Sequence, residues 1–134
     1  MFLLKRWIIV LLLCLSWPAQ ADISNAIVSL LSESFKQYDA EKYEQAAALL
    51  ERALGIDGRN PILWHNLAGV RLKQQDWKWA ADLATKSNTL IAGNDEQKGL
   101  RIRNFMLIAL ACEGMKDDGC ANEARKRAYA LAKG

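Results

Sequence analysis

Apolar and polar positions between residues 61 and 84 alternate with the period of an α-helix. Residues three and four apart share one face of a helix, and two such apolar faces follow each other here, separated by Gln75 and Asp76. The first face carries large residues and the second mostly alanines, so the two helices can pack closely. The stretch predicts a helical hairpin with Trp64, Leu67 and Ala68 on its first arm and Trp77, Ala80 and Ala84 on its second.

The pattern of the second arm also occurs 34 residues earlier in the chain. Tyr43 precedes Trp77 by this interval, and Ala46 precedes Ala80 by the same interval. A third helical pair follows, with Phe105 at the place of Trp64. A helical pair that recurs at this period indicates a repeat protein, because one hairpin cannot bury its own apolar face.

The central hairpin resembles the tetratricopeptide repeat (TPR) family, whose pattern is W-x2-L-G-x2-Y followed by A-x3-F. The matching residues are Trp64, Leu67, Ala68 and Ala80, and the departures from the usual aromatics are Arg71 and Ala84. The resemblance implies an all-α fold, a TPR helix-turn-helix solenoid of about six antiparallel helices in three stacked pairs. The chain is similar to small exported TPR proteins of Gram-negative bacteria.

The resemblance covers a TPR domain over residues 22–134. We place its repeats at about 27–60, 61–94 and 102–134, with a helical insertion at 95–101 that we interpret as two added turns on a long helix. Ser24 or Asn25 is expected to cap the first helix. The last helix, from Ala121 to Leu131, is expected to be short and rich in alanine.

Residues 1–21 have the pattern of a secretory signal peptide: a basic start, a short apolar run and small residues at 19 and 21. The pattern predicts cleavage before Asp22. An uncleaved membrane anchor is the alternative, which the shortness of the apolar run disfavours. A lipid anchor on Cys14 is disfavoured because Leu13, rather than a small residue, precedes it.

Cleavage changes the charge balance of the chain. The full sequence has 18 Lys and Arg against 15 Asp and Glu, a net charge of +3, but two of the basic residues lie in the signal, which leaves +1. A charge so close to zero gives no reason to expect binding to nucleic acid or to an anionic membrane. We therefore expect a periplasmic protein with no membrane span after cleavage.

The sequence contains no arrangement of residues typical of catalysis. His65 is the sole histidine, so a histidine-based metal cluster or catalytic triad lacks its parts. Asp117 and Asp118 stand in a polar turn, where carboxylates commonly cap helices. We expect no enzyme activity, no cofactor and no metal site.

Cys112 and Cys120 are the cysteines that remain after cleavage. They flank a short turn between two predicted antiparallel helices, which brings them within disulfide range, and export favours oxidation. Closing a loop of this length stabilises a fold by about 2–3 kcal/mol. The alternative of two free thiols stays open.

The TPR resemblance implies a concave groove lined by the first helix of each pair. An apolar groove suits an amphipathic helix or an extended apolar segment. We also expect Trp79 to be exposed, and an exposed tryptophan often anchors an interface. The groove residues that the resemblance implies are Val28, Leu31, Phe35, Tyr38, Ile62, His65, Leu72, Lys73, Arg103, Met106 and Leu110.

These expectations combine into one function. The sequence predicts a non-enzymatic protein-interaction or scaffold module of the bacterial cell envelope, which binds a protein or peptide in its groove. Two alternatives stay open: an accessory subunit of an envelope enzyme or maturation complex, and a self-associating TPR stack that forms a homodimer.

Overall fold

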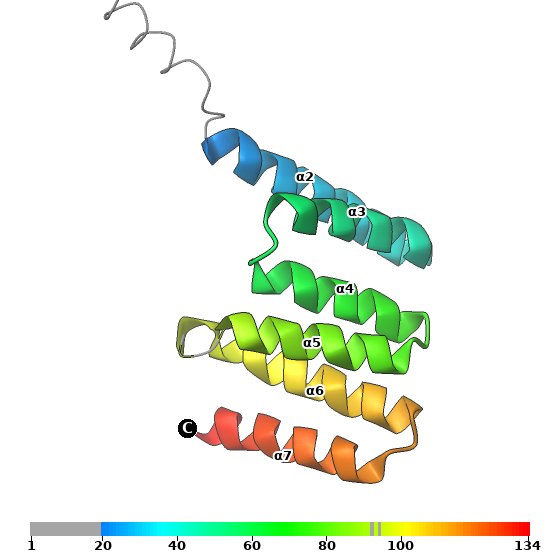
Figure 1. Ribbon diagram of the computed structural model, residues 1–134, viewed down its shortest axis with the longest axis vertical. Helices are drawn as coiled ribbons and strands as arrows, with labels where there is room; N and C mark the ends of the chain where they lie inside the picture. Colours follow the sequence, from blue (N-terminus) through cyan, green and yellow to red (C-terminus); the bar gives the residue numbers. More distant parts are fainter. Residues whose placement is uncertain (1–19, 92, 94) are drawn as a thin grey trace, which may run out of the picture.

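The computed structural model describes residues 20–91, 93 and 95–134. The predicted signal peptide therefore lies almost wholly outside the described residues. Within them, three antiparallel helical hairpins stack in chain order, so the three predicted helical pairs are confirmed (Figure 1). The helices are α2 (Gln20–Asp39), α3 (Tyr43–Ile56), α4 (Pro61–Lys73), α5 (Trp77–Ile91), α6 (Lys98–Gly114) and α7 (Asp118–Lys133), and the 3-10 helix η1 (Asp95–Gln97) precedes α6.

The repeat is visible in the turn inside each hairpin. Glu41, Gln75 and Lys116 have φ angles of 59°, 61° and 58°, which place each in the left-handed region, two residues after the end of a first helix. The next residue in each turn donates its backbone N–H to a carbonyl five residues earlier, which is the closing bond of a Schellman motif. The three turns are 34 and 41 residues apart. This spacing agrees with the predicted period and with seven added residues before the third hairpin.

The added residues 95–101 are helical, but they do not form two extra turns of one long helix. Asp95–Gln97 is a 3-10 turn, and α6 begins only at Lys98. The Arg101 guanidinium donates to the Ile91 carbonyl at 3.1 Å, which ties the start of α6 to the end of α5. Because α5 and α6 are antiparallel, part of the insertion has to reverse the chain direction, and only its remainder extends α6.

Two predicted helix ends differ from the structure. Ser24 and Asn25 lie inside α2, so neither caps it; the preceding Gln and Ala are good helix formers and carry the helix back to residue 20. The last helix is 16 residues long and so not short. Its start is capped by Asp117, whose carboxylate accepts the Cys120 backbone N–H at 3.0 Å, which confirms the predicted capping role.

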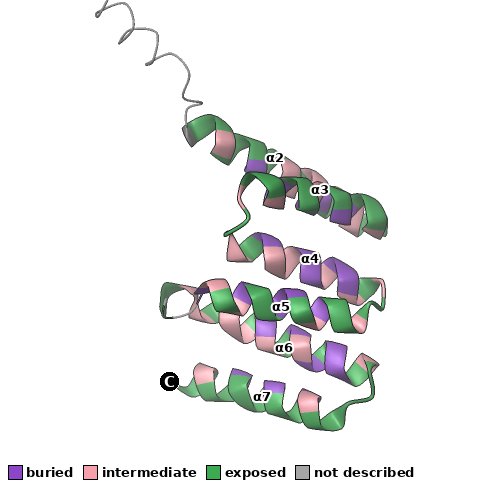
Figure 2. Ribbon diagram, in the orientation of Figure 1, coloured by how far each residue is buried: buried purple, intermediate pink, exposed green. Residues whose placement is uncertain are grey.

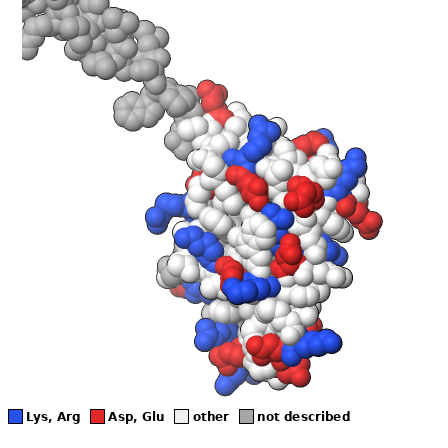
Figure 3. Space-filling view, turned by 45° about the vertical axis from the view of Figure 1, so that its right-hand side comes forward, with Lys and Arg blue, Asp and Glu red and all other residues white. Residues whose placement is uncertain are grey.

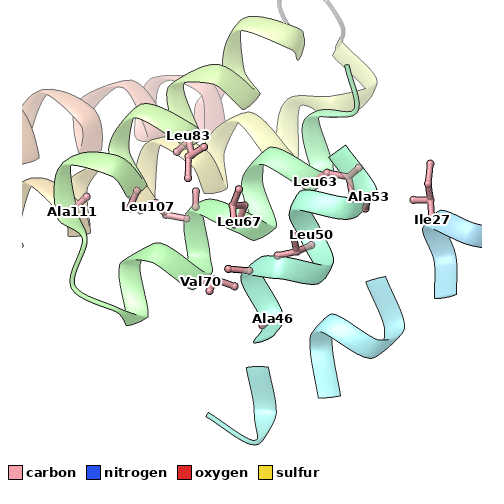
Figure 4. Close-up of a cluster of buried hydrophobic side chains, with 14 residues drawn as sticks. Ile27, Ala46, Leu50, Ala53, Leu63, Leu67, Val70, Leu83, Leu107 and Ala111 are labelled. Atoms are coloured by element: carbon pink, nitrogen blue, oxygen red, sulfur yellow. The ribbon is translucent and has the colours of Figure 1, made fainter. Parts of the chain in front are cut away.

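The core runs along the stack between neighbouring helices (Figures 2 and 4). Leu63 and Leu67 of the central helix α4 are buried, as are Leu50 of α3, Leu83 of α5 and Leu107 of α6. The second helix of each hairpin adds a small buried residue at one repeat position, which allows the two arms to approach closely. These small residues are Ala46, Ala80 and Ala121.

Candidate functional site

The first helices of the three hairpins, α2, α4 and α6, carry equivalent residues 34 and 41 positions apart. Equivalent residues of stacked repeats point in similar directions, so they form rows across one face of the stack. Eight of the groove residues implied by the TPR resemblance, together with Gly69, fall into three such rows. They are Val28, Ile62 and Arg103; Leu31, His65 and Met106; and Phe35, Gly69 and Leu110.

Several large hydrophobic side chains in these rows are open to solvent. Val28 is 61% exposed, Phe35 53% and Leu110 49%. Ile62 and Met106 are also exposed, so all three first helices contribute to an apolar surface. We call this surface, defined by the nine row residues, the row face.

Some predicted groove residues, within the row face and beside it, are less exposed or are charged. Leu31, Tyr38 and Leu72 are half-buried and pack against the hydrophobic core, so they support the row face more than they offer surface to a partner. Lys73 and Arg103 are exposed, and Arg103 is the positively charged last member of the row that begins with Val28.

A hollow of about 270 Å³ lies between α2 and α4 within the row face. Phe35 and Tyr38 form its aromatic wall on α2, and His65 lies on α4. Gly69 lines it at the repeat position where α2 and α6 carry Phe35 and Leu110. The missing side chain at Gly69 therefore leaves room for the hollow.

A buried polar network lies behind His65. Asn104 of α6 is fully buried, and its amide Nδ2 donates to Ser87 Oγ at 2.8 Å and to Asn88 Oδ1 at 2.9 Å. Ser87 Oγ in turn donates to the Pro61 carbonyl at 2.8 Å. The network joins α4, α5 and α6, and it satisfies the side chains of Asn104 and Ser87, which would be costly to bury unpaired.

The network fixes the tautomer of His65. A carbonyl only accepts, so the single Ser87 hydroxyl proton goes to Pro61, and Ser87 must accept from the Asn104 amide N–H. Asn104 Oδ1 is then the atom 2.7 Å from His65 Nδ1, which must carry a proton. In the neutral ring, Nε2 is therefore an acceptor.

The pKa of His65 is lowered from its ordinary value, chiefly because burial disfavours the charged ring. The hydrogen bond with Asn104 raises the pKa, and the positive charge of Arg103 lowers it. The ring is consequently neutral at neutral pH. Sequence reasoning did not single out Asn104, although a polar residue at the repeat position of the buried Leu63 was an available signal.

Arg71 explains one departure from the TPR pattern. Its side chain is almost fully buried and pairs with Glu51 Oε1 at 2.9 Å, which joins α4 to α3. Its guanidinium also lies 3.9 Å from the ring centre of Trp79, which joins α4 to α5. Trp79 is exposed as predicted, at 47%, but it already contacts Arg71.

The two predicted disulfide partners occupy the same repeat positions in the third hairpin. Cys112 lies 41 residues after Arg71, and Cys120 lies 41 residues after Trp79. The structure joins their sulfurs, with Cα atoms 5.8 Å apart. A covalent link in the last hairpin thus replaces the cation–π contact of the central one.

A second hollow, of about 550 Å³, is lined mainly by residues of α5, α6 and α7. Phe105 and Ile108 contribute apolar side chains to it, and Arg127 pairs with Glu123 at its edge. On the face seen in Figure 3, Lys and Arg are interspersed with Asp and Glu.

No helix among residues 20–91 and 95–134 is long and apolar enough to cross a membrane. No group of three or more His, Cys, Asp or Glu in the same residues is placed to hold a metal ion.

Solved structures with similar folds identify the class. The globular C-terminal domain of P. aeruginosa LpoP has a TM-score of 0.72 and 32% identity, covering 77% of this chain and 94% of that one. The N-terminal domain of stress-induced protein-1 (STI-1) from C. elegans has a TM-score of 0.75 at 15% identity, covering 81% of this chain and 86% of that one, a likeness that shows the fold alone. No family profile and no curated protein matches the chain.

The stacked hairpins and these likenesses define a TPR-like helical repeat domain. Because the identity with the LpoP domain exceeds 30% and extends over nearly all of that domain, the chain belongs to the family of the LpoP globular C-terminal domain.

Proposed function

We propose that the chain is a non-enzymatic protein-interaction module of the bacterial cell envelope, and that it binds a peptide or helix on its row face. One observation carries the proposal. Nine large hydrophobic residues are exposed in the described part of the chain, and five of them lie on the first helices. These five are Val28, Phe35, Ile62, Met106 and Leu110.

Several exposed apolar residues on one set of stacked helices are typical of a binding site, since exposed hydrophobic residues without a function are usually scattered singly. The three helices that carry the surface are held by a shared core, so the face is preformed. Family membership with an LpoP domain supports the envelope location, together with the predicted signal peptide.

Site-specific photo-crosslinking in cells tests the proposal. A photoreactive amino acid is placed at Met106 on the row face, or at Tyr129 on α7, which is also an exposed large hydrophobic residue. We expect a discrete crosslinked product from position 106 and none from position 129. Val28→Ser with Leu110→Ser should weaken that product, because both changes remove exposed apolar surface without opening the core.

Equal products from positions 106 and 129, or none from either, would contradict binding on this face. Leu72 is unsuitable as a test position because it packs against the core, so its truncation would disturb the fold as well as the surface.

A further inference from the structure

Several residues that line the hollow between α2 and α4 carry hydrogen-bond acceptors. Ser34 Oγ gives its proton to the Leu31 carbonyl at 2.7 Å, so it can only accept any further hydrogen bond. His65 Nε2 is an acceptor because Nδ1 donates to Asn104. The Asp39 carboxylate also lines the hollow, and it has no hydrogen bond or ion pair within the described chain.

Aromatic rings complete the lining. Phe35 is more than half exposed, and the ring of Tyr38 packs edge-on against Tyr43, with ring centres 5.6 Å apart. The faces of aromatic rings carry partial negative charge and attract cations. Asn66 adds an amide, which both donates and accepts. Arg103 does not line the hollow.

Gly69 provides an independent sign that the space is kept open. It lies inside α4, where glycine costs about 1 kcal/mol relative to alanine. A Cβ at this position would meet no atom within 4 Å beyond its own stretch of helix, and its backbone is not left-handed, so no steric need for glycine exists. A larger residue here would instead project into the hollow.

From this complementarity we infer that the hollow is a subsite for a guanidinium group, an arginine side chain of the bound partner. A planar cation rich in N–H donors matches the carboxylate, the acceptors and the aromatic wall together. At about 270 Å³ the hollow is smaller than the roughly 300–1,000 Å³ of sites for drug-sized molecules, which suits one side chain. This inference rests on the proposed function, since it names one residue of the partner.

NMR titration of the isotope-labelled protein, expressed as the full chain, tests the subsite without the partner. The probes are Nα-acetyl-arginine methylamide and its citrulline analogue, which has the same shape without the charge. We expect saturable shifts at Asp39, His65 and Gly69 with the arginine probe. The citrulline probe, and the Asp39→Asn variant with the arginine probe, should bind about two- to fivefold more weakly, as for an exposed ion pair.

Matched glycine variants separate the hollow from the rest of the surface. Gly69→Leu should abolish the shifts by filling the hollow. Gly55→Leu should bind like the natural protein, because Gly55 is also a helical glycine with open space around it but lies away from the hollow. Folding of both variants is checked from their amide spectra.

Three outcomes would overturn the inference: equal binding of the arginine and citrulline probes, no shifts at the hollow, or full binding by folded Gly69→Leu. If row-face crosslinking persisted in any of these cases, the interaction module would stand and only the guanidinium subsite would fall. If the crosslinking failed while the probe bound the hollow, the proposed function would fall instead.

Discussion

Single residues in the middle of the stack contribute both to packing and to the chemistry of the surface. Asn104 is buried and donates a hydrogen bond to Ser87. Its Oδ1 also fixes the tautomer of His65, which lies on the row face. Arg71 stands where the TPR pattern has an aromatic residue, and it replaces ring packing with an ion pair and a cation–π contact. Substitutions at these positions will therefore report on both packing and surface chemistry.

Leu67 is buried in the central helix, and its truncation should be costly. We expect Leu67→Ala to lower the free energy of unfolding by about 2–5 kcal/mol, because it removes core contacts and leaves a cavity. Val28→Ala is the matched control, since Val28 is exposed and should change stability by less than about 0.5 kcal/mol. Chemical denaturation midpoints measure both. Similar midpoints for the two variants would mean that the core lies elsewhere.

His65 should make stability depend on pH. Burial, the largest cause, lowers the pKa of the folded ring, so the unfolded chain, with an ordinary pKa near 6.5, binds the proton more readily. The free energy of unfolding should consequently fall as the pH falls below about 6.5. Denaturation at pH 7.5 and 5.5 measures the difference.

The control for this pH effect is His65→Gln, which keeps a side-chain donor for Asn104 but has no proton to gain in this range. The drop in stability between the two pH values should be smaller in the variant. An identical drop in both proteins would assign the pH dependence to other groups.

Sequence reasoning recovered the apolar positions of the row face but not its polar chemistry. Val28 and Leu110 followed from the repeat register, because a fixed period carries each position from one hairpin to the next. The tautomer of His65 did not follow, because it depends on Ser87 and Asn104, which are 17 residues apart on different helices. Such contacts are decided by packing, which a local pattern does not encode.

At the scale of the elements, each hairpin turns through a left-handed residue that is not glycine. Gln75 is the central example, with a φ of 61°. Gln75→Gly should raise the free energy of unfolding by up to about 1 kcal/mol, because glycine adopts this conformation without a steric penalty. Thermal and chemical denaturation measure the change.

The matched control is the same replacement inside a helix. Gln45→Gly in α3 should lower the free energy of unfolding by up to about 1 kcal/mol, because Gln45 is exposed and lies in the first turn of the helix, where glycine adds backbone freedom to the unfolded chain. A loss at Gln75 as large as that at Gln45 would argue against the left-handed turn.

The last hairpin should depend on its disulfide. The protein, denatured without reductant, should show no free thiols at Cys112 and Cys120, and reduction should lower the free energy of unfolding by about 2–3 kcal/mol in the chain-entropy model. The double variant Cys112→Ala with Cys120→Ala should be insensitive to reductant. Two titratable thiols in the untreated protein would contradict the link.

The sequence predicted these elements well, except where the chain has to change direction. Periodicity located each hairpin, but it read residues 95–101 as continuous helix, because the apolar pattern does not distinguish a 3-10 turn from the first turn of α6. Helix starts were similarly uncertain: Ser24 and Asn25 are good capping residues, but α2 continues past them.

At the scale of the molecule, the ends of the stack decide whether copies associate. The exposed side of α7 carries Asn122, Lys126 and Lys133, so the open end is mostly polar. We therefore expect a monomer at micromolar concentration, measured by sedimentation. A dimer would instead favour the self-associating alternative. Dissociation by Tyr129→Ser would place its contact on the third hairpin, and dissociation by Leu110→Ser alone would place it on the row face.

Because of the disulfide between α6 and α7, the two ends of the stack should differ in how easily they open. In a solenoid each hairpin contacts only its neighbours, so opening begins at an end. The disulfide closes the C-terminal hairpin, whereas at the other end only Ile27 and Ser34 are buried among residues 21–39 of α2. Amide protons of α2 and α3 should therefore exchange with solvent first, and a protease should shorten the protein from its N-terminal side.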